Sequence, residues 1–186
     1  MLIPLRLSAQ TDEQLMQRAA HGSERAFEEL YNRHARRLQG FFARRLGKDS
    51  DLAADFMHDT FLRLYAAREN YHEGRNFRAW LYTIAYNLCK NHFRNQFVMV
   101  ADEKEDVVAD IDIELEMVAT IFRKALREVL RHLPQPQAML FSLHYEEELT
   151  IPQIAQITSL PEGTVKSRLH KVMNTIKQQL QQYENK

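Results

Sequence analysis

Cysteine, glycine and proline are all scarce in this chain of 186 residues, and each scarcity excludes a class of protein. The single cysteine, Cys89, excludes a disulfide framework within one chain and fits a reducing compartment, so we expect a cytoplasmic protein. Only five glycines and five prolines favour long helices over hairpins and sheets. No apolar run approaches the ~18 residues of a membrane span, and no signal-peptide core is present, so we expect no membrane insertion.

The chain also lacks net charge, which at first argues against a nucleic-acid partner. The distribution reverses that impression. Residues 1–95 hold 15 Lys/Arg against 11 Asp/Glu, residues 96–119 hold 1 against 8, and residues 120–186 hold 9 against 6. Two mildly basic blocks therefore flank an acidic segment, and basic folded parts can bind phosphate in a chain that is neutral in total.

We interpret residues 96–113 as an acidic, flexible linker, because the segment is polar, lacks helical periodicity and exceeds the usual loop length. A surface loop of a single domain is the alternative. The predicted fold is all-α, with one helical domain at residues 1–95 and a second, carrying a helix-turn-helix, at residues 114–186.

The helix-turn-helix is predicted over residues 150–171. Thr150 with Gln153, and Ser159 with Glu162, fit the capping box that opens a helix. Pro152 and Pro161 fall in the predicted first turns, and the second helix has an apolar stripe formed by Val165, Leu169, Val172, Met173 and Ile176. Its opposite arc is polar and basic, as in a helix that reads the major groove, although a merely solvated face is the alternative. This arc comprises Thr164, Lys166, Ser167, Arg168, His170, Lys171 and Asn174.

Four helices are predicted in the N-terminal block. They begin at Thr11, after Ser23, at Ser50 and at Phe77, and the loop 71–76 precedes the last of them. That last helix, to about Arg94, has a regular core stripe and a second apolar group formed by Tyr82, Tyr86 and Phe93. The second group either packs against neighbouring helices or forms a platform on which unpaired bases stack.

Catalytic and metal-binding patterns are weak. Asp55 with His58, and Cys89 with His92, have ligand-like spacing, but neither pair has the further ligands that a metal site needs. We therefore expect no catalytic residue, no metal, no cofactor and no enzymatic activity.

Four stretches follow one another with characteristic gaps, namely Ala26–Tyr31, Asp55–Leu64, Phe77–Asn87 and Pro161–Leu169. In that order they resemble the opening helix, the polymerase-docking helix, the promoter-melting segment and the reader of the minus-thirty-five element in the extracytoplasmic-function (ECF) group of alternative sigma factors of bacterial RNA polymerase. The resemblance covers residues 11–182. It implies a protein that binds core RNA polymerase, directs it to promoters and helps to open the minus-ten element.

The resemblance also implies roles for individual residues. Contact with the β′ clamp is implied for Asp55, His58, Asp59, Phe61 and Arg63. Contact with the minus-ten element, or support of that contact, is implied for Tyr71, Gly74, Arg75, Asn76, Phe77, Trp80, Asn87, Lys90 and Arg94. In the minus-thirty-five element, contact with base edges is implied for Ser167, His170 and Lys171. Contact with phosphates is implied for Thr164, Lys166 and Arg168. The implied partners are core RNA polymerase, through its β′ clamp and β flap, promoter DNA and an anti-sigma factor.

The chain departs from the family pattern at three places. Ala54 and His58 stand where the family has Glu and Gln, Thr158-Ser159 stands where the turn has Leu-Gly, and Val172-Met173 replaces an Ala-Arg pair. The alternative function is that of a stand-alone helix-turn-helix regulator, which binds duplex DNA without polymerase.

Overall fold

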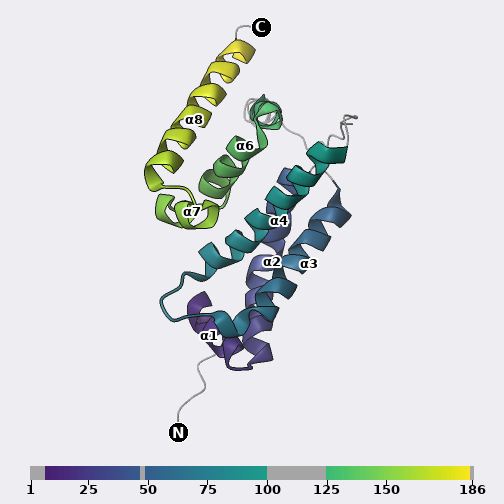
Figure 1. The fold of residues 1–186 in the computed structure, drawn as a ribbon, viewed down its shortest axis with the longest axis vertical. Helices are drawn as coiled ribbons and strands as arrows, with labels where there is room; N and C mark the ends of the chain where they lie inside the picture. Colours follow the sequence, from purple (N-terminus) through teal and green to yellow (C-terminus); the bar gives the residue numbers. More distant parts are fainter. Residues whose placement is uncertain (1–6, 47–48, 100–124, 185–186) are drawn as a thin grey trace, which may run out of the picture. The chain divides into compact units, whose positions relative to one another are not determined.

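A computed structural model describes residues 7–46, 49–99 and 125–184 (Figure 1). Within these ranges the chain forms helices and no strand, which confirms the all-α prediction. The helices fall into two compact units, one built around α1 to α4 and the other around α6 to α8. From residue 100 onward the predicted linker lies outside the described residues, as do the first residues of the predicted C-terminal domain. None of the described helices has the length and apolar character needed to cross a membrane.

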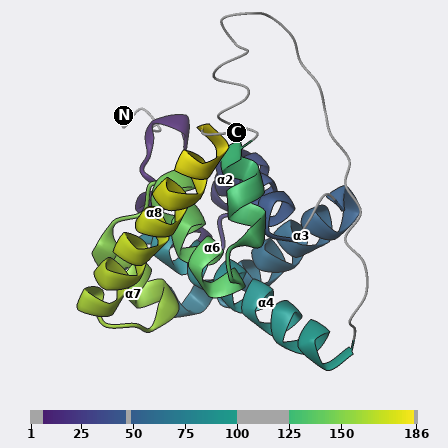
Figure 2. The ribbon, with the colours of Figure 1, turned by 90° about the horizontal axis from the view of Figure 1, so that it is seen from above.

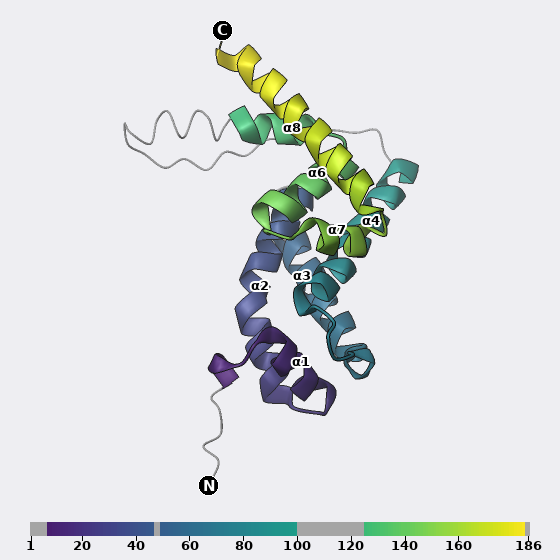
Figure 3. The ribbon, with the colours of Figure 1, turned by 90° about the vertical axis from the view of Figure 1, so that its left-hand side faces the viewer.

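The N-terminal unit contains four helices, namely α1 (Asp12–Ala20), α2 (Glu24–Leu46), α3 (Ser50–Ala66) and α4 (Phe77–Met99), with a short 3-10 turn, η2 (Arg68–Asn70), before the last. The predicted capping box of α1 is formed, because Gln14 N donates to Thr11 Oγ1 (3.2 Å) and Thr11 N donates to Gln14 Oε1 (3.0 Å). Figure 3 shows α1 beside the first turns of α2. Helix α4 continues past Arg94 to Met99, into the segment predicted as linker.

Aromatic contacts join the three long helices of this unit into one core. Phe41 of α2 meets Tyr82 of α4 with ring centroids 5.5 Å apart, and Phe42 of α2 meets Phe56 of α3 at the same distance. Tyr82 is only 2% exposed. For Tyr82, packing against neighbouring helices is therefore the right interpretation, and a base-stacking platform is wrong.

The C-terminal unit contains a helical segment at residues 125–132 and then α6 (Gln135–Phe141), a π-helical turn η3 (Ser142–Glu146), α7 (Ile151–Thr158) and α8 (Glu162–Glu184). Helices α6 and α8 lie side by side (Figure 2). Their shared core consists of Val129, Leu133, Ala138, Phe141, Val172 and Ile176. Val165, Leu169, Val172 and Ile176 are buried, which confirms the predicted inner stripe of α8, and Met173 packs on its edge.

Helices α7 and α8 with their connecting turn form the predicted helix-turn-helix. The capping box of Thr150 and Gln153 is present and Pro152 lies in the first turn of α7. The second predicted box, of Ser159 with Glu162, is wrong. Ser159 adopts φ 57° and ψ 32°, a left-handed conformation that ends α7, whereas a residue that caps a helix start needs an extended backbone. Pro161 precedes α8 instead of lying in its first turn.

Candidate protein and nucleic-acid interfaces

One side of α3 presents a mixed acidic and apolar surface. Asp55, His58, Asp59 and Leu62 recur at three- and four-residue spacing and so share a face of the helix. Leu62 is 69% exposed, and it adds an apolar side chain to this otherwise polar face. Asp59 Oδ1 accepts a hydrogen bond from Arg63 Nε at 3.0 Å, so these two predicted polymerase contacts form one exposed ion pair.

A shallow apolar groove of about 370 Å³ adjoins this face, lined by Phe27, Tyr31, His58, Phe61, Leu62 and Tyr65. Phe61 is 3% exposed and packs against Tyr31, with ring centroids 4.8 Å apart. Since its ring is covered, Phe61 forms the floor of the groove. His58 stands at the edge, 3.1 Å from its Nε2 to the Tyr31 hydroxyl oxygen. Sequence reasoning missed Leu62, although its helical spacing from Asp55 and His58 marked it.

The loop between η2 and α4 is organised around Trp80. Tyr71 is stacked on the Trp80 ring at 5.4 Å between centroids, and the Arg75 guanidinium lies 4.6 Å from the centroid of that ring. The Tyr71 hydroxyl donates to the carbonyl oxygen of Arg75 at 2.6 Å, and Gly74 takes φ 83°, which glycine adopts without strain. The structure thus brings Tyr71, Arg75 and Trp80 together, with Gly74 in the loop between Tyr71 and Arg75.

Burial raises the pKa of Tyr71 to about 12, and the negative charge of Glu13 adds to the shift while Arg75 opposes it. The phenol therefore remains a neutral donor throughout the physiological range. Trp80 is 5% exposed, so its ring faces protein rather than solvent. The exposed tip of the loop is formed by His72, Glu73 and Gly74.

The remaining predicted minus-ten residues lie at the start of α4 or further along it. Asn76 is half-buried just before the helix, where its Oδ1 accepts from the backbone N–H of Ala79 at 2.9 Å. Phe77 is fully buried at the start of α4, where it can support the loop but not touch a ligand. Asn87, Lys90 and Arg94 are exposed further along α4. Trp80, Asn87 and Arg94 are seven residues apart and so follow one side of the helix, over about 21 Å at 1.5 Å per residue.

The predicted DNA-reading arc lies on the first turns of α8. Lys166, Ser167, Arg168, His170 and Lys171 are exposed and Thr164 is half-buried. Ser167 Oγ donates to the carbonyl oxygen of Thr164 at 3.0 Å. No carboxylate among the described residues pairs with Arg168 or Lys171, so both cations face solvent.

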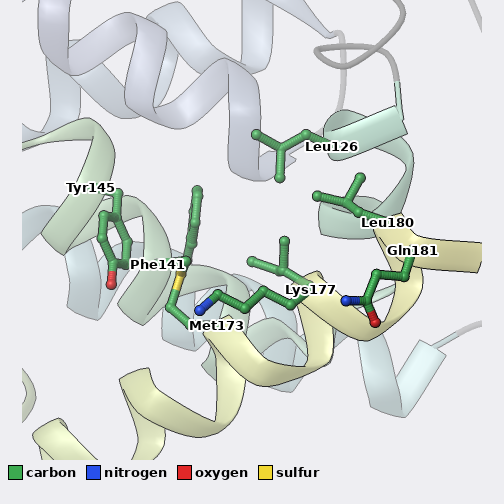
Figure 4. Close-up of a pocket in the computed structure, with 8 residues that line it drawn as sticks. Leu126, Phe141, Tyr145, Met173, Lys177, Leu180 and Gln181 are labelled. Atoms are coloured by element: carbon green, nitrogen blue, oxygen red, sulfur yellow. The ribbon is translucent and has the colours of Figure 1, made fainter. Parts of the chain in front are cut away.

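A second apolar groove, of about 420 Å³, lies along the C-terminal half of α8 (Figure 4). It is lined by six apolar or aromatic side chains and two polar ones, namely Leu126, Phe141, Tyr145, Met173, Ile176 and Leu180 with Lys177 and Gln181. The groove and the DNA-reading arc therefore occupy different halves of the same helix.

Metal-ligating side chains do not gather in the part of the chain that the structure describes: no three His, Cys, Asp or Glu residues there could hold one ion. Cys89 is fully buried, and burial raises its pKa to about 12, with the Arg45 charge acting in the opposite direction. The His92 ring packs on Phe56 at 5.3 Å between centroids.

Comparison with known proteins matches each of the two units to a protein family. The family described as Sigma-70 region 2 matches residues 30–97, and the family described as Sigma-70, region 4 matches residues 123–181. The ECF RNA polymerase sigma-E factor of Haemophilus influenzae is 27% identical over 183 residues, covering 92% of this chain and 96% of the relative. The RNA polymerase sigma factor CarQ of Myxococcus xanthus is 29% identical over 170 residues, covering 91% and 97%.

Two solved structures share the fold. CnrH, in complex with the cytosolic domain of CnrY, matches with a TM-score of 0.69 and 23% identity, covering 91% of this chain and 97% of that one. The sigma factor RpoE of Bartonella quintana, in complex with the anti-sigma factor NepR, matches with a TM-score of 0.68 and 22% identity, covering 83% and 96%.

A helical unit of the region 2 type and a helix-turn-helix unit of the region 4 type define a promoter-specificity factor of bacterial transcription. The chain belongs to the sigma-70 family, in its ECF group, and so binds core RNA polymerase and directs it to promoters. A stand-alone regulator is not favoured, because the N-terminal unit matches a sigma region.

Proposed function

We propose that the two units divide the work of initiation, with the N-terminal unit docking on polymerase and opening the minus-ten element while the C-terminal unit reads the minus-thirty-five element. The domain limits that we propose are residues 1–95 and 114–186. The observation that carries the proposal is the correspondence between units and families, since region 2 and region 4 each match one unit.

The docking surface is the exposed face of α3. Asp55, His58, Asp59 and Arg63 supply charged and polar groups around Leu62, and the groove floored by Phe61 supplies apolar area beside them. An apolar centre with a charged rim is the usual composition of a protein interface. We assign this surface to the β′ clamp, as the resemblance implies.

The minus-ten surface is the tip of the loop 71–76 together with the outer side of α4. Opening a duplex costs stacking energy, which a protein recovers by holding an extruded base. The exposed loop tip is placed to hold such a base, while Asn87, Lys90 and Arg94 offer donors and charge to the backbone that follows. Trp80 and Phe77 support the loop from below because both are buried.

The minus-thirty-five surface is the start of α8. Ser167, His170 and Lys171 project donors and acceptors suited to base edges. Thr164, Lys166 and Arg168 supply the contacts to phosphates that fix the register of the helix on the duplex.

Two protein contacts complete the proposal. We assign the apolar groove beside the C-terminal half of α8 to the β flap of polymerase, since it lies apart from the DNA-reading arc. CnrH and RpoE were each solved with a protein partner, the cytosolic domain of CnrY and the anti-sigma factor NepR. On that basis we infer that an anti-sigma factor restrains this chain too. We further infer that the chain itself acts in the cytoplasm, without catalysis and without a cofactor.

Transcription from a genomic fragment library by bacterial core polymerase, with and without the chain, tests the proposed function. New start sites that share two spaced upstream elements are the expected result. Tight duplex binding by the chain without any new start, using polymerase of the same organism, would instead support a stand-alone regulator.

A further inference from the structure

The carboxylate of Glu13, on α1, lies at the N-terminus of α4. Its Oε1 accepts hydrogen bonds from the backbone N–H of Phe77 at 3.2 Å and from Asn76 Nδ2 at 3.4 Å. Asn76 Oδ1 in turn accepts from the backbone N–H of Ala79 at 2.9 Å. The first amides of a helix have no partner within the helix and favour a negative charge nearby. Glu13 and Asn76 together therefore complete the start of α4.

The neighbouring residue Asp12 fastens α1, the helix that carries Glu13, to α2. The Asp12 carboxylate accepts from Arg33 Nη1 at 3.1 Å and is 2.7 Å from His34 Nε2, and both partners belong to α2. Arg33 also donates to two backbone carbonyl oxygens that precede α1, those of Leu7 and Gln10. Two consecutive acidic residues thus tie α1 to α2 on one side and to the start of α4 on the other.

The bonds of Glu13 fall where the loop 71–76 passes into α4. One residue earlier, the Arg75 carbonyl oxygen accepts the Tyr71 hydroxyl, and the Arg75 guanidinium covers the Trp80 ring. If the Glu13 contact is lost, Asn76 and Phe77 lose the group that fixes this junction, and the cover over Trp80 loses its anchor. The exposed tip at His72–Gly74 is then no longer held in one orientation relative to α4.

We propose that Glu13 is a positioning residue for promoter opening, which holds the loop 71–76 in the one conformation that receives an unpaired minus-ten base. This inference rests on the proposed minus-ten function of the loop. It gives α1 a part in DNA recognition although none of the residues assigned to the minus-ten element belongs to this helix.

Trp80 provides a direct readout, because it is the only tryptophan of the chain. We expect Glu13→Ala to make Trp80 more accessible to acrylamide quenching in the full-length free chain. Glu13→Gln, which keeps an acceptor oxygen and loses only the charge, should fall between Glu13→Ala and the natural chain. Glu28→Ala is the matched control, because Glu28 is exposed on α2 and should leave quenching unchanged.

The second readout is the affinity of each holoenzyme for a single-stranded non-template oligonucleotide that carries the minus-ten sequence found in the transcription experiment. We expect Glu13→Ala to weaken this binding about tenfold, the scale of one charge-assisted hydrogen bond, with core polymerase affinity unchanged. Glu13→Gln should recover most of the loss.

Three results bear against the inference. Unchanged quenching and unchanged oligonucleotide affinity in Glu13→Ala would overturn it. Loss of core polymerase binding in both Glu13 variants would assign the residue to the fold as a whole and would overturn it too. If the natural holoenzyme does not prefer the minus-ten oligonucleotide to a scrambled one, the proposed function of the loop fails, and with it the positioning role, even where quenching shows that Glu13 holds the loop.

Discussion

Asp12 shows how one side chain can fasten a helix to its neighbour. Burial alone would raise the pKa of this carboxyl, but hydrogen bonds and charge from His34 and Arg33 outweigh burial and hold the pKa below its ordinary value of 3.8. A carboxyl with a lowered pKa in the folded state contributes stability above its unfolded pKa, and that contribution is lost as pH falls through the folded pKa.

We therefore expect Asp12→Asn to reduce the free energy of unfolding at pH 6–7, and the deficit to shrink as pH falls below about 4. Urea unfolding of both proteins at several pH values measures the difference. Glu28→Gln, at an exposed position of α2, should show no such pH-dependent deficit. A deficit for Asp12→Asn that stays constant down to pH 3 would show that the carboxylate charge is not what holds α1 to α2.

At the scale of helices and turns, a helix start that is capped by neighbouring residues could be predicted from the sequence, and one capped by a distant residue could not. The capping boxes that open α1 and α7 lie within four residues of sequence, so Thr11 and Thr150 identified both helix starts. The cap of α4 needs Glu13, 63 residues before Asn76, and no local pattern encodes such a pair. Phe61 lies in the family motif, but the motif does not indicate that its side chain is only 3% exposed and packs against Tyr31 of α2.

The turn between α7 and α8 explains the failure of the second capping box and supports a prediction. Ser159 adopts φ 57°, a left-handed conformation that costs an L-residue about 1–2 kcal/mol. Glycine avoids this cost but loses about 0.5–1 kcal/mol through its greater freedom in the unfolded chain. We expect Ser159→Gly to stabilise the C-terminal unit by about 0.5–1 kcal/mol.

Thermal unfolding followed by circular dichroism measures this gain, while Trp80 fluorescence reports only on the N-terminal unit and should not shift. Ser159→Ala is the matched control, since it keeps the β-carbon and should bring no gain. If the glycine variant is no more stable than the alanine variant, the conformation of Ser159 is not a source of strain in the turn.

For the whole molecule, the proposed division of labour predicts that each unit can be impaired without the other. Leu62→Asp removes an exposed apolar side chain from the proposed docking face. Full burial of a leucine contributes about 1.5–3 kcal/mol, so core polymerase affinity should fall about ten- to hundredfold. Because Leu62 takes no part in the buried core, helix content and duplex binding by the free chain should be unchanged. Unaltered core affinity would remove this face of α3 from the docking surface.

Lys171→Ala makes the complementary prediction. Lys171 is exposed on α8 and is assigned to a base edge, so its loss should relax minus-thirty-five preference by about 1–3 kcal/mol at one position. Core polymerase affinity should be unchanged, as measured by competition for core enzyme. Lys171→Arg, which keeps the positive charge, separates charge from the geometry of base recognition. If Lys171→Ala abolishes polymerase binding, the start of α8 serves the enzyme rather than the promoter, and the two units do not divide the work as proposed. If both single variants behave as expected, the variant that carries both changes should lose polymerase affinity and promoter preference by the same factors, because the two substitutions act on different binding partners of the chain.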